Sequence, residues 1–216
     1  MSSFSLKIIA IICMLIDHIG FLFFPNLNIL RAIGRLALPL FAFQIGIGFK
    51  NTKSKEKYIL RMIIFTLISQ YPFWLFTKTA IPNAAFSLNV GATLTLGLLA
   101  LYCIEKFKNK FLKIIIPLLI IAIAFFVPMD YGWYGVLTII LFYIFNQNKV
   151  LTFSSYLATL LSYMIYKNSL FAWPSIFSLI PIFMYNGQKG KNIKYLFYVF
   201  YPLHMLILVG VYNFIY

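Results

Sequence analysis

Long apolar runs, each about as long as a bilayer is thick, alternate with short polar segments along the chain. A helix that spans the hydrocarbon core needs about 20 apolar residues, with a range of about 17–25. Nine runs of roughly this kind are found, at about 5–24, 30–49, 58–77, 86–104, 112–127, 132–146, 150–166, 170–184 and 196–215. The pattern therefore predicts an all-α, polytopic membrane helical bundle with about nine transmembrane helices. The runs from 112 to 184 are short, so two of them are also compatible with re-entrant or broken segments.

Composition strengthens this prediction, because 62% of the residues are hydrophobic and only 10% are charged. Soluble domains carry about 25% charged residues. No linker, repeat or low-complexity tract interrupts the chain, so residues 1–216 are expected to form a single domain. The first run lacks a small-residue cleavage site and carries polar groups, which argues against a cleaved signal peptide. Cys13 and Cys103 lie inside apolar runs and are expected to pack as small hydrophobic side chains, without a disulfide or a metal.

The formal net charge of +14 reflects membrane topology rather than nucleic-acid binding. Basic residues gather in alternate loops, which hold Lys50, Lys53, Lys55, Lys57 and Arg61, then Lys106, Lys108, Lys110 and Lys113, then Lys149, and finally Lys189, Lys191 and Lys194. The loops between them hold only Lys78 and Lys167. The positive-inside rule then predicts a cytoplasmic amino terminus in a multi-pass protein of the plasma membrane. The partner implied for these surfaces is the lipid bilayer.

The adjacent pair Asp17-His18 is the most informative polar feature, because it lies inside the first apolar run. An ionisable side chain at membrane depth costs several kcal/mol unless it is paired or hydrated, so it is a candidate functional group. At a rise of about 1.5 Å per residue, His18 lies roughly 20 Å from the cytoplasmic face. Neighbouring helical residues point about 100° apart, so Asp17 is expected to pair with Arg31 or Arg35 rather than with His18. The alternative is a plain ion pair between helices.

Other polar side chains are predicted at similar depth, in the middle and outer half of the membrane. They are Gln70 in the third run, Asn89 at the start of the fourth, Trp133 and Tyr134 at the sixth, and His204 in the ninth. We expect them to line a polar cavity formed by the first, second, third, fourth and ninth spans. Pro39, Pro72 and Pro202 remove backbone hydrogen bonds in three of these spans, and broken helices often line cavities.

Lys7 and His18 are eleven residues apart, so three helical turns bring them to nearly the same face, about 16 Å apart. A long anionic ligand with its head at Lys7 and its reactive end at His18 would fit this stripe, and acyl-coenzyme A has that shape. The plainer alternative is that Lys7 extends to the membrane interface. His204 could likewise be a mid-span histidine that hydrogen-bonds a neighbour. The sequence has no phosphate-binding loop, dinucleotide-binding glycine motif, metal-ligand cluster or serine nucleophile elbow.

Several motifs, in order, resemble the TraX family. They are Leu6–Ala10, Met14–Gly20, Arg31–Phe43, Tyr58–Arg61, Ile68–Phe73, Tyr131–Gly135 and Phe200–His204. The resemblance implies an acetyl-coenzyme A-dependent membrane acetyltransferase similar to a pilin acetylase, and a relation to transmembrane acyltransferases that modify sugars. That broader group has a basic residue, ten intervening residues and a histidine in its first helix. Lys7 and His18 match the spacing, with Lys where Arg is usual, and Gln70 stands where many TraX-like sequences have Glu.

These observations lead to three hypotheses. The first is an acyltransferase that takes acetyl-coenzyme A and acylates an unknown peptide or glycan acceptor, with no metal. His18 would be the general base, Asp17 and His204 further catalytic candidates, and the expected donor- or substrate-binding residues are Lys7, Arg31, Arg35, Gln70, Tyr71, Asn89, Trp133, Tyr134 and Tyr201. The second is a small transporter or channel that uses the buried Asp, His and Arg. The third is a membrane scaffold whose basic loops meet anionic lipid.

Overall fold

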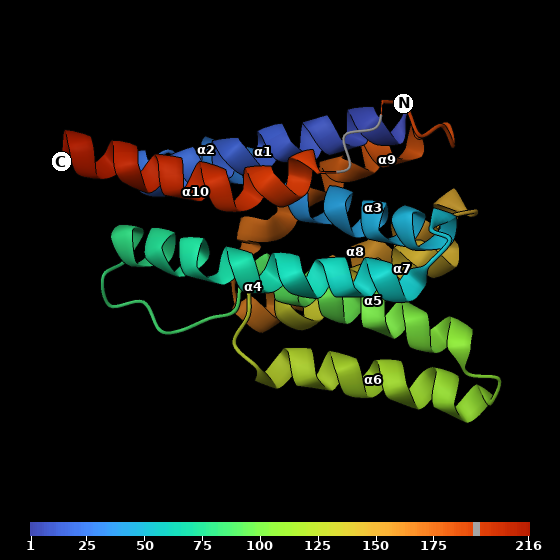
Figure 1. Cartoon of the computed structure of the whole chain (residues 1–216). Coiled ribbons are helices and arrows are strands. Elements are labelled where there is room, and N and C mark those ends of the chain that lie inside the picture. The colour runs from blue at the N-terminus through green and yellow to red at the C-terminus, as the bar shows by residue number, and fades with distance from the viewer. Residues whose placement is uncertain (192–194) are drawn as a thin grey trace. The chain divides into compact units, whose positions relative to one another are not determined.

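The computed structural model describes residues 1–191 and 195–216, and the described residues are almost entirely helical (Figure 1). The helices are α1 (Ser3–Phe23), α2 (Asn28–Gly34), α3 (Ala37–Asn51), α4 (Lys55–Ala80), α5 (Val90–Lys106), α6 (Lys110–Phe126), α7 (Gly132–Phe145), α8 (Lys149–Lys167), the 3-10 helix η1 (Leu170–Ser178), α9 (Leu179–Phe183) and α10 (Leu196–Ile215). Each predicted run therefore coincides with helical structure, which confirms the all-helical class. Lys194, one of the predicted cytoplasmic lysines, lies outside the described residues.

Short polar side chains at the predicted boundaries begin several helices. Ser2, Asn109 and Asn148 each accept a hydrogen bond from a backbone N–H in the first turn of α1, α6 and α8. Such caps satisfy backbone donors that have no partner inside the helix. At the other end of α8, Asn168 adopts a left-handed conformation with φ 47°, which Asn tolerates better than most residues. Local sequence thus accounts for where these helices start and stop.

Two predicted spans are not single regular α-helices. The second divides into α2 and α3 at Arg35 and Leu36. Pro39 explains the position of the break, because a proline ring clashes with the carbonyl four residues earlier, here that of Arg35. The eighth forms η1 followed by the short α9, and Pro174 and Pro181 both deprive this segment of backbone donors.

Within the part of the chain that the structure describes, four segments are long and apolar enough to cross a membrane: α1, the α2–α3 stretch 28–51, α4 and α10. The other described helices are shorter or less apolar, such as α7 with 14 residues and α5 and α6 with 17 each. The chain therefore contains helices with the length and composition of membrane-spanning segments. The count of nine spans and the cytoplasmic amino terminus stay predictions.

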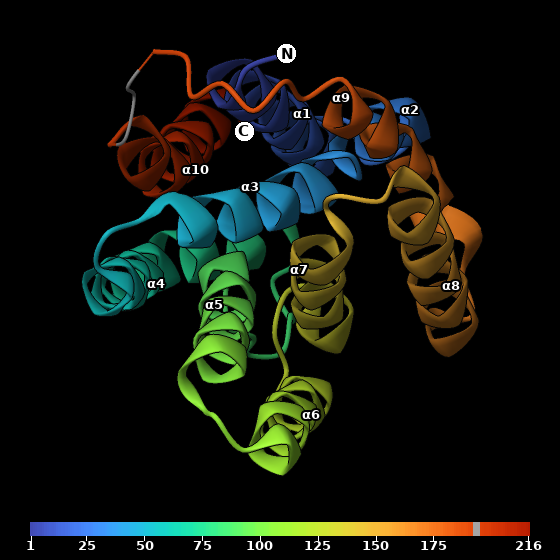
Figure 2. The same ribbon diagram turned by 90° about the vertical axis from the view of Figure 1, so that its right-hand side faces the viewer.

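The helices group into two compact units, each assembled from segments that alternate along the sequence. The first unit comprises residues 1–41, 67–86 and the described residues from 169 to 216; the second comprises 42–66 and 87–168. In the first unit, α1 packs against α2 and α10, and α2 packs against η1. In the second, α5, α6 and α7 pack around one another and α8 packs on α7 (Figure 2).

Glycines allow close helix contacts in the first unit. A methyl group built on Gly20 of α1 would lie 2.6 Å from Cβ of Leu30 in α2. One built on Gly34 of α2 would overlap the side chain of Asp17 in α1. Small residues let helix backbones approach closely in membranes. These two glycines therefore set the spacing of α1 and α2, which carry Lys7, Asp17, His18 and Arg31.

Candidate active site

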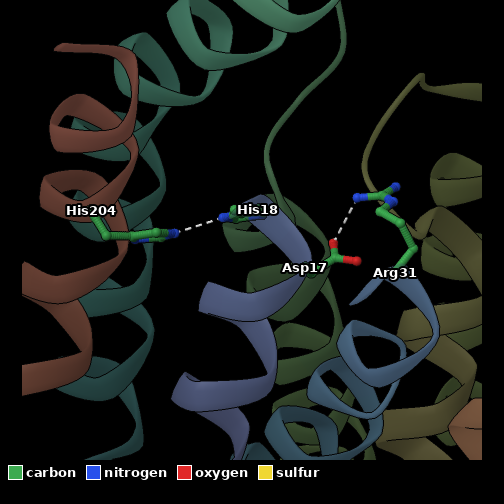
Figure 3. Close-up of polar contacts among 4 residues, drawn as sticks. All are labelled: Asp17, His18, Arg31 and His204. Atoms are coloured by element: carbon green, nitrogen blue, oxygen red, sulfur yellow. Dashed lines mark hydrogen bonds and ion pairs between the residues drawn. The ribbon is translucent and has the colours of Figure 1, made fainter. Parts of the chain in front are cut away.

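Helix α1 directs Asp17 and His18 toward different neighbours within the first unit. Figure 3 shows Asp17 facing Arg31 of α2, while His18 faces His204 of α10 on the other side of α1. The separation follows from helix geometry, because consecutive side chains point about 100° apart. One turn of α1 thus joins a carboxylate–guanidinium pair to a histidine pair.

The carboxylate of Asp17 is paired with Arg31, as predicted from the need for a counter-ion. Nη1 of Arg31 donates to Oδ2 of Asp17 at 3.0 Å, and the two side chains are only 19% and 12% exposed. The Arg31 guanidinium also lies over the ring of Phe21, 4.5 Å from its centroid. Arg35, the alternative partner, lies over the ring of Phe171 in η1 at 4.8 Å. Aromatic faces thus hold both arginines beside α1.

The two histidines of the chain form a short, in-plane hydrogen bond. Nδ1 of His18 and Nε2 of His204 are 2.6 Å apart, the ring centroids are 4.9 Å apart, and the planes are inclined by 3°. The centroid separation exceeds the N–N distance by about two ring radii, so both nitrogens lie on the line between the ring centres. The rings are therefore joined end to end, with the nitrogen lone pair of one directed at the nitrogen of the other.

Aromatic rings surround this histidine pair. Phe76 of α4 lies 4.9 Å from His18 between centroids, and Phe200 stacks on His204 at 4.7 Å with an angle of 10°. Tyr201 is 6.5 Å from His18 and 5.9 Å from His204, and its side chain is buried. His204 itself is 4% exposed, whereas His18 is only half-buried. The arrangement buries His204 more completely than His18.

His204 also makes a second hydrogen bond, to its own helix. Its Nδ1 lies 2.8 Å from the carbonyl oxygen of Phe200, one turn earlier in α10. Pro202 deprives the carbonyl of Tyr198, not that of Phe200, of its usual backbone donor.

Lys7 lies near the amino end of α1, close to a second cation. Backbone N–H groups of Ser3 and Phe4 donate to the carbonyls of Gln188 and Lys189 at 2.8 and 3.1 Å, so segment 188–189 runs beside the start of α1. Lys7 is half-buried, and the charge of Lys189 acts on it. Two ammonium groups from distant parts of the sequence are thus brought to one end of α1.

On α4, the side chains on the face that contacts His18 are not Gln70 and Tyr71. Tyr71 is 63% exposed and stacks on Trp74, and it lies about 140° around the helix from Phe76, which contacts His18. Gln70 is half-buried and lies about 120° from Phe76. Tyr71 therefore points away from His18, and the proposed part of Gln70 and Tyr71 in donor or substrate binding stays a prediction. Ser69 shares the face of Phe76, two turns away, and is fully buried.

Three predicted residues belong to the second unit. Asn89 is fully buried; its oxygen accepts from the N–H of Gly91 at 2.7 Å, and its amide donates to the carbonyl of Thr66 at 2.8 Å. It has the structural role of an N-cap for α5. The Tyr134 hydroxyl is hydrogen-bonded to that of Tyr156 at 2.9 Å, and Trp133 packs edge-on against Tyr163 at 6.0 Å. Their part in donor or acceptor binding stays a prediction.

Sequence reasoning missed Phe76, Phe200 and Ser69. An apolar ring in an apolar span carries no signal of its own, and only packing against His18 or His204 distinguishes Phe76 and Phe200. Ser69 precedes Gln70 directly, and only the phase of α4 shows that it, rather than Gln70, points inward. Across residues 1–191 and 195–216, no three His, Cys, Asp or Glu side chains are grouped as a metal site would require.

Comparison with known proteins gives a family and two relatives. The sequence model of the family described as TraX protein matches residues 2–212. A probable fimbrial assembly protein FimC, serogroup H1, of Dichelobacter nodosus is 34% identical over 233 aligned residues, which cover 96% of this chain and 94% of the relative. An uncharacterized protein RP591 of Rickettsia prowazekii (strain Madrid E) is 30% identical over 149 residues, covering 67% of this chain and 56% of the relative. No solved structure matches the chain significantly.

Proposed function

The chain belongs to the TraX family, and we propose that it is an integral-membrane acyltransferase. It moves an acetyl or other short acyl group from cytoplasmic acyl-coenzyme A to an amine or hydroxyl acceptor. The observation that carries the proposal is the hydrogen bond between His18 and His204, which joins two membrane-length helices 186 positions apart in the sequence. A histidine in this setting suits proton transfer, because its ordinary pKa lies near neutrality.

In the proposed reaction, His18 is the general base. It takes the proton from the acceptor N–H or O–H while the acceptor atom attacks the carbonyl carbon of the thioester. The bond between that carbon and sulfur then breaks, and His18 returns the proton to the departing sulfur. The products are the acylated acceptor and coenzyme A as the free thiol, and the histidine is regenerated.

The paired charges beside α1 support this role indirectly. Asp17 and Arg31 tie α1 to α2 and so fix the orientation of the turn that carries His18. Arg31 also places a guanidinium group beside this turn. Fixed positive charge near the reacting carbonyl would stabilise the oxyanion that forms when the acceptor attacks.

The donor end of the site is proposed to lie at the amino end of α1. Lys7 and Lys189 offer two cations to the phosphates of acyl-coenzyme A, about 16 Å along α1 from His18. The basic loops predict that this end of α1 faces the cytoplasm, where acyl-coenzyme A is available. The acceptor would approach His18 from within the membrane or from the outer side.

Family membership links the chain to pilus assembly and pilin processing, and the Dichelobacter relative is described as a probable fimbrial assembly protein. The favoured acceptor is therefore the amino terminus of a pilin-like peptide, with a cell-surface glycan hydroxyl as the second choice. An amine must be neutral to attack the thioester, and a base such as His18 meets that need.

The direct test is transfer of radiolabel from acetyl-coenzyme A by the purified full-length protein in detergent. The acceptors are a pilin-type peptide with a free amino terminus, the same peptide with a blocked amino terminus, and a glycan. We expect His18→Ala to lower transfer by about 10²-fold or more, the contribution of general acid–base catalysis. Cys13→Ala is the matched control, since it removes another buried side chain of α1. Unchanged transfer in His18→Ala would refute the role of this residue.

Donor binding is tested separately by calorimetry with acetyl-coenzyme A. Lys7→Ala is expected to weaken binding about 10- to 100-fold, because one charge-assisted hydrogen bond contributes about 1.5–3 kcal/mol. Lys57→Ala, which removes an exposed lysine of the second unit, should leave binding unchanged. Solute flux in proteoliposomes without an acyl donor, together with no binding and no transfer, would favour a transporter instead.

A further inference from the structure

The hydrogen bonds of the two histidines define which ring nitrogen of His18 can act as a base. The consequence for catalysis rests on the proposed function. The assignment itself follows from the contacts of His204, which is held at both of its ring nitrogens: Nδ1 at the carbonyl of Phe200 and Nε2 at Nδ1 of His18.

A carbonyl oxygen can accept a hydrogen bond but cannot donate one. The contact of 2.8 Å between Nδ1 of His204 and the carbonyl of Phe200 therefore requires a proton on Nδ1. A neutral imidazole carries one N–H, so Nε2 of neutral His204 has a lone pair and acts as an acceptor. The stacked Phe200 ring holds the imidazole in the orientation that makes both contacts.

The lone pair on Nε2 of His204 then determines which ring nitrogen of His18 carries a proton. A contact of 2.6 Å along the line of the ring centres needs one proton between the nitrogens, and it must come from Nδ1 of His18. We infer that His204 is a positioning residue that holds His18 with its proton on Nδ1, so that Nε2 of His18 is the atom that takes the acceptor proton. Nε2 lies on the edge of the ring that is turned away from His204, and His18 is the less buried of the two histidines.

The same geometry limits how many protons the pair can hold. If both rings were imidazolium ions, two N–H groups would face each other across 2.6 Å, which excludes the doubly charged state. The pair therefore accepts a single additional proton, at Nε2 of His18. When that proton is bound, His204 still accepts from Nδ1 and stabilises the charged ring. His204 thus acts through His18 and needs no contact with either substrate.

The first experiment reads the tautomer without any substrate. The chain contains only two histidines, so a protein labelled with ¹⁵N-histidine in lipid nanodiscs gives four ring-nitrogen signals. Above neutral pH we expect a protonated Nδ1 and an unprotonated Nε2 in both rings, with a scalar coupling across the bond between Nδ1 of His18 and Nε2 of His204. A major form of His18 with its proton on Nε2 would overturn the inference, whatever the activity of the protein.

The second experiment compares three variants of His204 by steady-state kinetics and by the same spectrum. His204→Gln can place an amide oxygen near the position of Nε2 and accept from His18, but it cannot carry a proton. His204→Asn is too short to reach His18, and His204→Ala removes the acceptor. We expect kcat to fall about 10²-fold in the Ala and Asn variants, to stay within about ten-fold of wild type in the Gln variant, and KM for acetyl-coenzyme A to change little.

The outcomes separate this inference from the proposed function. If wild-type protein neither transfers acetyl groups nor cleaves the thioester, yet shows the expected tautomers, the proposed acyltransferase activity would be refuted. The tautomer assignment of the two histidines would still stand. Activity lost in His18→Ala but retained in His204→Ala would refute the positioning role. A Gln variant as inactive as Ala would mean that His204 itself carries a proton during the reaction, which also contradicts the inference.

Discussion

Substitution of Gly34 by Ala tests the close contact that brings Asp17 and Arg31 together. An alanine Cβ at this position would lie well under 3.0 Å from Cβ, Cγ and Oδ1 of Asp17. Carbon atoms in contact normally stand about 3.5–4.0 Å apart, so the overlap is about 1 Å or more. The side chain of Asp17 cannot avoid it by rotation, because Cβ is fixed to the backbone of α1. Helices α1 and α2 must therefore move apart.

The expected cost combines two effects. Overpacking in a well-packed region costs about 1–3 kcal/mol. Separating the helices also lengthens the ion pair of 3.0 Å between Asp17 and Arg31, and complete loss of a buried pair costs about 3–5 kcal/mol. The pair is partly exposed and would be stretched rather than removed, so only a fraction of that second cost applies. We expect Gly34→Ala to lower the free energy of unfolding by about 2–4 kcal/mol.

The assay is reversible unfolding by SDS in mixed micelles, followed by the fluorescence of the three tryptophans and by far-ultraviolet circular dichroism. Gly210→Ala in α10 is the matched control, because a methyl group there meets nothing within 4 Å. That variant should be stabilised by about 0.5–1 kcal/mol, the advantage of alanine over glycine within a helix. A Gly34→Ala protein as stable as wild type would refute the close approach of α1 and α2.

Three further predictions concern the second unit and the topology. Tyr134→Phe should lower the free energy of unfolding by about 1–3 kcal/mol, because it removes a hydrogen bond between two buried hydroxyl groups; the double variant with Tyr156→Phe should lose less than the sum of the single losses. Asn89→Ala should cost about 2 kcal/mol in the same unfolding assay, since it removes the cap of α5. In a background without native cysteines, Lys57→Cys should react with thiol reagents only from the cytoplasmic side and Lys167→Cys only from outside; the opposite result would reverse the orientation.

The site shows where sequence patterns stop being informative. The need for a counter-ion limited the partner of Asp17 to Arg31 or Arg35, and the structure forms the ion pair with Arg31. Both arginines lie near Asp17, and spacing along the sequence did not distinguish them. By contrast, no pattern joined His18 to His204, because each is an isolated polar residue in its own apolar run.

The sequence alone determined which segments are helical. Apolar runs of membrane length have few ways to satisfy their backbone groups, and caps such as Asn148 mark where the runs begin. Pro39 likewise marked the interruption of the second span, whereas α4 and α10 continue as helices through Pro72 and Pro202, contrary to the expectation of broken helices there. These are local properties, because a helix closes its hydrogen bonds within a few residues, so local sequence is enough to specify them.

Only the tertiary structure decided which polar groups meet. Side chains on different helices come together according to the rotation and spacing of those helices, which depend on many packing contacts at once. The phase of α4 turns Ser69 and Phe76 inward and Tyr71 outward, and the approach of α10 to α1 places His204 within 2.6 Å of His18. Such contacts depend on distance in space rather than on spacing in sequence. Helical rise could therefore suggest a depth in the membrane for each polar side chain, but it could not identify the side chain that it contacts.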